Sequence, residues 1–343
     1  MDGINSTGLP ANQSDFGSVF THQVLPSLYF VIFLVGVPLN GVAAWIFFRV
    51  PNDSALVVYL KNMAVADLLM LATFPFRVAV ELGLGGWHLQ VALCRYTSVL
   101  FYSSMYVCIF FMGLISLERY VKIVRRAWPA LLLQSAGVAR VVALLSWSLL
   151  LFLCVLPNAL LTSQPGDEES SWNCMLLKSP LGVEWHQATA HFSVVLFWLT
   201  LLVLAFCYAS IARRLRQSYR RVRRDSADVR RKSNRSIFCL LAVFFVCFVP
   251  YHVCRVPYTL SQMPDSGFNQ ASRFWLFHLK EGTLFLSALN VCLDPVIYFL
   301  MCQTFRESLL RKLSARQRLV SVTTPPGLDT VPGGTRGAGA GVH

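Results

Sequence analysis

The chain places cationic side chains inside or at the ends of long apolar segments, where an unpaired charge is expensive. Arg255 is the plainest case, because it interrupts the apolar run 237–260 between two prolines. A guanidinium binds a phosphate through two parallel hydrogen bonds, and an ammonium acts as a point charge. These residue types at these places indicate a site for an anionic, phosphate-bearing ligand. The residues concerned are Arg77, Arg95, Arg255 and Lys280, and His186 opens a further apolar segment.

A simpler explanation has each long cationic side chain reach out of the membrane to the headgroup region. That explanation suits Arg77 or Arg95 taken alone. It suits Arg255 less well, because this residue lies about a turn and a half beyond Pro250 along a helix. The only acid that we expect at comparable depth is Glu281, which leaves an excess of cations. Stacking surfaces and hydroxyl groups for a ligand would come from Tyr102, Tyr106 and Tyr258.

Long apolar segments must position these side chains. Of the 343 residues, 55% are hydrophobic and 14% are charged, whereas a soluble domain has about 25% charged residues. A helix of about 20 apolar residues crosses a bilayer. We therefore expect an all-α membrane protein, with a seven-transmembrane helix bundle over residues 23–301. The expected spans are residues 25–48, 56–80, 96–117, 141–161, 186–212, 237–260 and 274–301.

Basic residues are unevenly distributed among the connections. Eleven fall within residues 213–235, and others surround the link between the third and fourth spans or follow the seventh. Because loops rich in Lys and Arg stay in the cytoplasm, residues 1–22 are expected to form an extracellular tail and the C-terminus to lie inside, in a multi-pass protein of the plasma membrane. The other class of protein that a net charge of +13 suggests, one that binds nucleic acid, does not fit seven spans. Sequons in the tail make Asn5 and Asn12 expected glycosylation sites.

Most of the ten cysteines lie within apolar spans, where a free thiol behaves as a small hydrophobic group. Only Cys94, at the outer start of the third span, and Cys174, in the outer loop after the fourth, face an oxidising compartment. We predict a disulfide between them. The alternative is a pair of free thiols.

The segment after the seventh span alternates apolar and basic residues at helical spacing. Residues 302–318 are expected to form a short amphipathic eighth helix that contacts the lipids of the inner leaflet. Residues 319–343 are rich in Gly and Pro and are expected to be a disordered cytoplasmic tail.

Four polar residues are expected deep within the spans. They are Asn40, Asp67, Asn290 and Asp294. A buried carboxylate must be paired, protonated or bound to a cation. One interpretation is a small cavity near Asp67 that holds water or Na⁺. The other is hydrogen bonding between helices for packing, and the residues alone leave both open.

A charged tripeptide, Glu118-Arg119-Tyr120, closes the third span at its inner end. Adjacent Glu and Arg side chains can pair locally, and a partner that inserts there could break the pair. The tripeptide can therefore act as a switch. The alternative is an interfacial anchor, because Arg and Tyr favour membrane boundaries.

Seven spans carrying these motifs resemble a rhodopsin-like (class A) G-protein-coupled receptor over residues 22–313. The motifs are the Glu118 tripeptide, the run Asp294-Pro295-Val296-Ile297-Tyr298, Trp147 in the fourth span and the Cys94/Cys174 pair. The resemblance implies that Pro250, Pro295 and Tyr298 take part with Glu118, Arg119 and Tyr120 in switching and in coupling to a heterotrimeric G protein. Arrestin is a further partner of such receptors.

Shorter stretches, among them "FFVCFVPYH" and "LKEGTLFLSALNVCLDPVIYF", resemble the purinergic nucleotide receptors, in the branch for ADP and UDP-sugars. By that resemblance, Arg255 and Lys280 hold phosphates, and the base and ribose lie among Tyr102, Asn158 and His186. The branch couples mainly to inhibitory G proteins. The residues that match its ligand-site pattern are Tyr102, Tyr106, Asn158, Lys178, His186, Arg255, Tyr258, Gln262, Lys280 and Glu281.

The chain also departs from that branch. Nucleotide members often join the N-terminal tail to the last outer loop by a second disulfide, but residues 1–27 and 261–274 contain no Cys. Ala190 stands where the branch has Asn. Orphan members with proposed lysophospholipid ligands share such features.

We therefore expect a receptor for a nucleotide or nucleotide sugar, with no cofactor other than a possible Na⁺. The alternatives are a lysophospholipid receptor with the same cationic site, and a membrane transporter or non-signalling decoy. An enzyme is not expected, because the hydrolase and nucleotide-binding motifs are absent from the sequence.

Overall fold

The computed structural model describes residues 17–49, 54–124, 134–162, 174–219, 227–261 and 267–323. Seven helical spans in these ranges are long and apolar enough to cross a membrane. The prediction of an all-α, seven-span membrane protein is therefore confirmed. In chain order, spans one to seven are Phe20–Phe47, Ala55–Glu81, Gly86–Val124, Ala136–Leu161, Pro180–Arg214, Phe238–Ser261 and Gln270–Met301.

Several spans consist of more than one helical segment. The label η marks a segment of π-helix, and α marks a segment of α-helix. Span one joins η2 to α1, span three joins α3, η3 and α4, span four joins α6, η4 and α7, and span seven joins α10 to α11. The bounds are η2 Phe20–Val24, α1 Leu25–Phe47, α2 Ala55–Glu81, α3 Gly86–Ala92, η3 Leu93–Thr97, α4 Ser98–Val124, α6 Ala136–Leu149, η4 Leu150–Val155, α7 Leu156–Leu161, α8 Pro180–Tyr219, α9 Ala227–Ser261, α10 Gln270–Ala288, α11 Asn290–Met301 and α12 Gln303–Thr323.

Polar caps and glycines set where the helices begin and end. The side chain of Ser54 accepts a hydrogen bond from the backbone nitrogen of Val57 at the start of α2. The side chain of Asn269 accepts one from the backbone nitrogen of Ser272 at the start of α10. After α2 the chain reverses through glycines, with Gly85 at φ 80°, a conformation that other residues rarely adopt. This reversal brings the start of span three beside the C-terminal end of span two.

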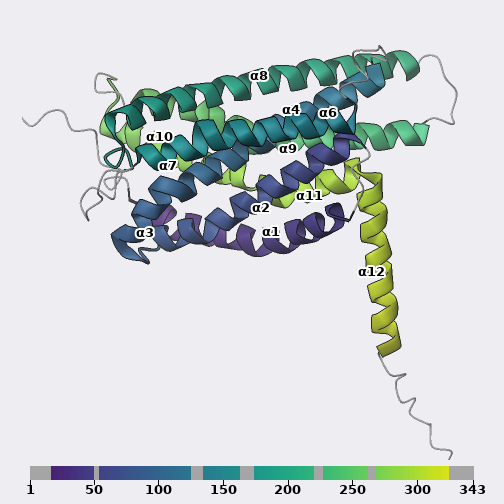
Figure 1. Ribbon diagram of the computed structural model, residues 1–343, viewed down its shortest axis with the longest axis horizontal. Helices are drawn as coiled ribbons and strands as arrows, with labels where there is room; N and C mark the ends of the chain where they lie inside the picture. The colour runs from purple at the N-terminus through teal and green to yellow at the C-terminus, as the bar shows by residue number, and fades with distance from the viewer. Residues whose placement is uncertain are drawn as a thin grey trace, which may run out of the picture. The chain divides into compact units, whose positions relative to one another are not determined.

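Spans two and three form the centre of the bundle. The helix α2 packs against α1, α4 and α6, while α4 also packs against α8, and α9 packs against α10 (Figure 1). In the most apolar stretches of spans two and three, 67% and 61% of the residues are buried, against 11% in span four. Span four therefore lies at the edge of the bundle, with most of its surface facing outward.

Large apolar side chains cover the outside of the bundle. Leu144 is 68% exposed, and Leu202 and Phe206 are also exposed. In water such a surface would drive aggregation, whereas lipid chains solvate it. The outward face thus agrees with a bundle that lies in a bilayer.

The disulfide between Cys94 and Cys174 is present, as predicted. It joins η3, in the first half of span three, to the segment that precedes α8. The segment that enters span five is therefore held beside the first half of span three.

The chain divides into two compact units, Met1–Arg306 and Glu307–His343. The helix α12 begins at Gln303, where an amphipathic eighth helix was predicted, and continues to Thr323, five residues past the predicted end. Phe305, in the first turn of α12, is buried against Phe47 with ring centroids 5.0 Å apart. At the other end of the chain, helix begins at Phe20, within the expected tail 1–22.

Candidate functional site

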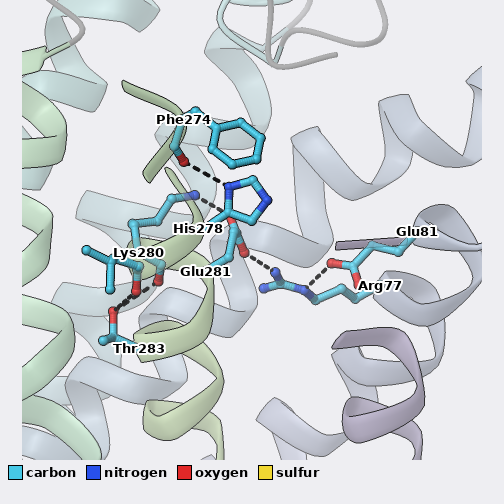
Figure 2. Close-up of polar contacts among 8 residues, drawn as sticks. Arg77, Glu81, Phe274, His278, Lys280, Glu281 and Thr283 are labelled. Atoms are coloured by element: carbon cyan, nitrogen blue, oxygen red, sulfur yellow. Dashed lines mark hydrogen bonds and ion pairs between the residues drawn. The ribbon is translucent and has the colours of Figure 1, made fainter. Parts of the chain in front are cut away.

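Two cations and two acids pair between the C-terminal end of span two and the N-terminal half of span seven. Arg77 donates to Glu81 over 2.8 Å and to Glu281 over 2.6 Å, and Lys280 pairs with the other oxygen of Glu281. Figure 2 shows Glu281 between Arg77 and Lys280. We call these four residues the outer ion cluster, after the side of the membrane that the sequence predicts for them. The formal charges within the cluster cancel.

This arrangement corrects the expectation that Glu281 is the only acid at this depth. Glu81 lies one turn beyond Arg77 on α2, at the i,i+4 spacing that favours an ion pair. The excess of cations expected from the sequence is therefore smaller, because Arg77 and Lys280 both have carboxylate partners.

Aromatic rings complete the surroundings of the cluster. The guanidinium of Arg77 lies 4.5 Å from the centroid of the Tyr29 ring. The ammonium of Lys280 lies 4.9 Å from the Tyr258 ring and 5.0 Å from the Phe277 ring. Lys280 and Glu281 are buried, at 8% and 9% exposure. Rings and carboxylates together compensate for the loss of water around these charges.

Arg255, on α9, has different partners. Its guanidinium donates to the hydroxyl of Tyr106 over 2.7 Å and lies 5.8 Å from the centroid of the Tyr251 ring. Among the described residues, no carboxylate pairs with Arg255. Its positive charge is therefore met by neutral aromatic groups, in a side chain that is half-buried.

The Tyr106 hydroxyl connects Arg255 to a buried histidine one turn lower on α9. The Nδ1 of His252 lies 2.8 Å from the carbonyl oxygen of Phe248, so Nδ1 carries the proton and donates. The other ring nitrogen, Nε2, therefore accepts from the Tyr106 hydroxyl over 3.0 Å. The imidazole also stacks on Phe197, with centroids 3.7 Å apart.

Lys178 and Asn158 form a third group, at the end of span four. The ammonium of Lys178 donates to Asn158 Oδ1 and to Thr162 Oγ1, each over 3.1 Å. Arg95 donates to the carbonyl oxygen of Thr162 over 2.5 Å. Burial lowers the pKa of Lys178. These contacts fix the loop that follows the disulfide.

The structure thus distributes the predicted ligand residues over three groups. Tyr106 and Arg255 are in direct contact, and the ring of Tyr102 is stacked 6.4 Å from that of Tyr251 beneath Arg255. Tyr258, Lys280 and Glu281 belong to the outer ion cluster and its rings, whereas Asn158 and Lys178 pair with each other. His186 is exposed, and Gln262 lies outside the described residues.

Deep in the bundle, Asp67, Asn290 and Asp294 meet, each fully buried. The amide of Asn290 donates to both carboxylates over 3.3 Å, and Tyr298 donates to Asp67 over 2.5 Å. Ligating atoms of Asp67, Cys108 and Asp294 lie within 4.8 Å of one another. Two buried carboxylates this close require a proton or a cation between them.

The oxygens of this cluster fit a hard cation such as Na⁺. One oxygen each of Asn290 and Asp294 has no hydrogen-bond partner among the described residues. The amide nitrogen of Asn40 donates to the carbonyl oxygens of Gly36 and Val291 and so joins α1 to α11. Sequence reasoning missed Cys108, whose thiol donates to Asp67 over 3.4 Å. A cysteine within an apolar span carries no sign in the sequence that it contacts a carboxylate.

The model of the 7 transmembrane receptor (rhodopsin family) matches residues 39–298. The chain belongs to this family. The bovine purinoceptor 14 is 45% identical over 90% of this chain and 92% of its own length. The mouse G-protein coupled receptor 87 is 44% identical over 88% of this chain and 84% of its own length. The human purinoceptor 13 is 39% identical over 83% of this chain and 80% of its own length.

The comparisons confirm the resemblance to the purinergic receptors that the sequence motifs suggested. The protein is therefore a membrane receptor and not an enzyme. Neither the transporter nor the lipid-receptor alternative gains support from these relatives, two of which are named as purinoceptors.

At the C-terminal end of span three, the receptor has the expected local pair. Arg119 lies 3.6 Å from Glu118, and it also donates over 3.1 Å to the carbonyl oxygen of Met301, the last residue of α11. The ring of Tyr120 packs on Phe206 of α8, with centroids 5.4 Å apart. Arg119 therefore ties span three to span seven, a contact that the sequence did not reveal.

Pro250 lies within α9, shortly before His252 and Arg255 in the chain. The hydroxyl of Ser287 on α10 donates over 2.8 Å to the carbonyl oxygen of Cys247, within a turn of Pro250. Pro295 lies within α11 between Asp294 and Tyr298, beside the buried carboxylates. Both prolines interrupt the hydrogen bonding of a helix where a polar side chain meets its backbone.

The receptor's N-terminal segment is held to α10 without a disulfide. Nδ1 of His278 donates to the carbonyl oxygen of Phe274, so Nε2 accepts from the Ser18 hydroxyl over 2.7 Å. The ring of Phe20 lies 6.0 Å from that of His278. These contacts join the N-terminal segment to α10, in span seven.

Proposed function

We propose that the receptor responds to an extracellular nucleotide or nucleotide sugar whose phosphates bind Arg255. The observation that supports this most strongly is the charge of Arg255, which is half-buried and meets only neutral groups among its described partners. A phosphate would supply the missing anion and accept two hydrogen bonds from the guanidinium. Two of the relatives are named as purinoceptors.

Lys280 would add a second contact to the phosphates. Its ammonium carries three donors, and Glu281 uses one of them. A phosphate can therefore be bound without separating Lys280 from Glu281. Tyr102 and Tyr258 would stack on the base, and Asn158 and His186 would meet the ribose.

Ligand binding would favour the active state through α9. A phosphate that draws Arg255 and Lys280 together would tilt the outer half of α9 inward about Pro250 and swing its inner half outward. The swing would open the inner end, free Arg119 from Glu118 and Met301, and admit a helix of a G protein. The ligand shifts this equilibrium only by its difference in affinity for the two states.

The remaining partners follow from the same proposal. The receptor lies in the plasma membrane with its N-terminus outside, because its inner connections carry the basic residues. Asn5 and Asn12, which lie outside the described residues, would carry glycans. Coupling would be to an inhibitory G protein, with arrestin as a later partner, and Na⁺ near Asp67 would favour the inactive state.

The test is a panel of nucleotides, nucleotide sugars and lysophospholipids assayed for inhibition of cAMP formation in cells expressing the receptor. The variant Arg255→Ala should lose the response, and Arg255→Lys should keep part of it, because the charge remains without the bidentate geometry. Arg273→Ala is the matched control, since it removes a cation from the start of α10.

All variants are compared at equal surface expression. An undiminished nucleotide response of Arg255→Ala would refute the proposed site. A response to lysophospholipids alone would refute the proposed ligand class while leaving a phosphate site in place.

A further inference from the structure

A cysteine lies among the buried carboxylates of the bundle. Sγ of Cys108, on α4, lies 3.4 Å from Oδ1 of Asp67, on α2. Ligand atoms of these two residues and of Asp294, on α11, all lie within 4.8 Å of one another, and each residue is 0% exposed. Among the described residues, no other group of three His, Cys, Asp or Glu side chains brings its ligand atoms this close. The cluster therefore offers a cation both sulfur and oxygen.

The distance between this sulfur and oxygen suits a small tetrahedral ion. Zn²⁺ binds thiolate sulfur at about 2.3 Å and carboxylate oxygen at about 2.0 Å, so tetrahedral angles place the two ligand atoms about 3.5 Å apart. The observed 3.4 Å between Cys108 Sγ and Asp67 Oδ1 is close to that value. A rotation of the Asp294 side chain, whose oxygen already lies within 4.8 Å of both atoms, would bring a third ligand to the same ion.

The other oxygens of the cluster are arranged to support such an ion. Tyr298 donates to Oδ2 of Asp67, which leaves Oδ1 beside the sulfur. Outer partners of this kind orient a ligand and raise metal affinity. Oδ1 of Asp294 and Oδ1 of Asn290 are fully buried and have no hydrogen-bond partner among the described residues. The amide nitrogen of Asn290 lies 3.3 Å from both carboxylates, and a half-turn of the amide would put its oxygen there as a fourth ligand.

Charge and ligand type favour a divalent, thiophilic cation. Two ionised carboxylates carry two negative charges, which Na⁺ balances only in part and a divalent ion balances in full. Mg²⁺ keeps several waters in an octahedral shell, and Ca²⁺ takes about six to eight oxygen ligands. A fully buried cluster with one sulfur suits neither ion, whereas thiolate is a preferred ligand of Zn²⁺.

We propose that Asp67, Cys108 and Asp294 form a binding site for Zn²⁺, with the amide oxygen of Asn290 as the fourth ligand. On binding, the Cys108 thiol gives its proton to water and its sulfur bonds the ion. The ion then joins α2, α4 and α11 and stabilises the present arrangement of spans two, three and seven. An agonist that favours another arrangement binds more weakly when Zn²⁺ is bound, because each ligand shifts the equilibrium by its difference in affinity for the two states.

The test uses the purified full chain in detergent, titrated with Co²⁺, which takes tetrahedral sites in place of Zn²⁺ and absorbs light. A bond between Co²⁺ and thiolate gives an intense charge-transfer absorption in the near ultraviolet, which a site of oxygen ligands lacks. We expect this absorption to saturate and then to disappear when Zn²⁺ displaces Co²⁺. Zn²⁺ should also raise the unfolding temperature, whereas Mg²⁺ should not.

Two variants and a control assign the site. Cys108→Ser should abolish the charge-transfer absorption and weaken Zn²⁺ binding more than roughly tenfold, the smallest cost of losing even an outer partner of a ligand. Tyr298→Phe leaves every ligand atom in place but frees Asp67, so the absorption should remain while Co²⁺ binds roughly tenfold more weakly. This variant keeps the test decisive if Cys108→Ser folds poorly. The matched control is Cys207→Ser on α8, which removes an equally buried thiol and should bind Co²⁺ as the unmodified chain does.

An unchanged absorption in Cys108→Ser, or an equal loss in Cys207→Ser, would overturn the proposal, because the thiolate would then lie elsewhere. Stabilisation by Mg²⁺ equal to that by Zn²⁺ would overturn it as well, since a hard ion has no need of the sulfur. No agonist enters these measurements, so failure here is distinguishable from failure of the proposed nucleotide site.

Discussion

Glu281 holds the outer ion cluster together, and its removal tests that role. It pairs with both Arg77 and Lys280, and its side chain is 12% exposed. Glu281→Gln would leave two cations with one carboxylate, that of Glu81. Removing one partner of a buried ion pair costs about 3–5 kcal/mol. Because water still reaches part of the cluster, we expect a loss of about 3 kcal/mol in the free energy of unfolding, or a fall of roughly 6 °C in the unfolding temperature.

Two further variants separate this cause from a general loss of packing. Glu81→Gln should cost only about 1 kcal/mol, because the side chain of Glu81 is 20% exposed and Arg77 keeps Glu281. Lys280→Gln combined with Glu281→Gln should lower the free energy of unfolding by less than Glu281→Gln alone. The double variant leaves no unpaired cation at position 280.

The assay is thermal unfolding of the purified receptor in one detergent, with Glu184→Gln as the control for an exposed acid on α8. The control should change stability by less than about 0.5 kcal/mol. If Glu281→Gln unfolds at the temperature of the control, or the double variant is less stable than the single one, the cluster does not stabilise the fold as described.

Three further perturbations test other parts of the receptor. Tyr106→Phe removes both hydrogen bonds at that hydroxyl and leaves His252 Nε2 without a donor, so stability should fall by about 1–3 kcal/mol in thermal unfolding and agonist potency should fall with it. The lowered pKa of Lys178 means that the unfolded chain binds the proton more readily; stability should therefore rise as the pH approaches the ordinary lysine pKa of about 10.4, and Lys178→Gln should flatten that rise. Asp67→Asn should abolish any rise of the unfolding temperature with NaCl relative to KCl, whereas an unchanged salt response would exclude Na⁺ from this cluster.

The spans and the disulfide could be predicted because they follow from local sequence. A run of about 20 apolar residues has few alternatives to a membrane helix, and the alternation of spans leaves Cys94 and Cys174 on one side. The meeting of Asp67, Asn290 and Asp294 was foreseeable for a similar reason, since buried polar groups must find one another.

The partners of individual charges could not be predicted, because they depend on how each helix is rotated and which rotamer each side chain adopts. Arg119 donates to the backbone of Met301, and a sequence does not indicate which carbonyl oxygen accepts a hydrogen bond from a side chain. Asn40 donates a hydrogen bond to the backbone of α11 rather than to the carboxylates. The pair of Arg77 with Glu81 is the exception, because its i,i+4 spacing is visible in the sequence.

Arg255 and Lys280 carry the same charge but are suited to different tasks. Lys280 has a carboxylate partner in the absence of a ligand, so a phosphate gains little there beyond an added contact. Among the described residues, the partners of Arg255 are a phenol hydroxyl and an aromatic ring, so a phosphate would improve its surroundings in proportion to its burial. Under the proposed function, the difference in affinity that would move α9 therefore comes mainly from Arg255. The Tyr106 hydroxyl, which binds Arg255, also binds His252, and His252 binds the backbone of Phe248. This chain of hydrogen bonds ends within a turn of Pro250, where the bend would occur.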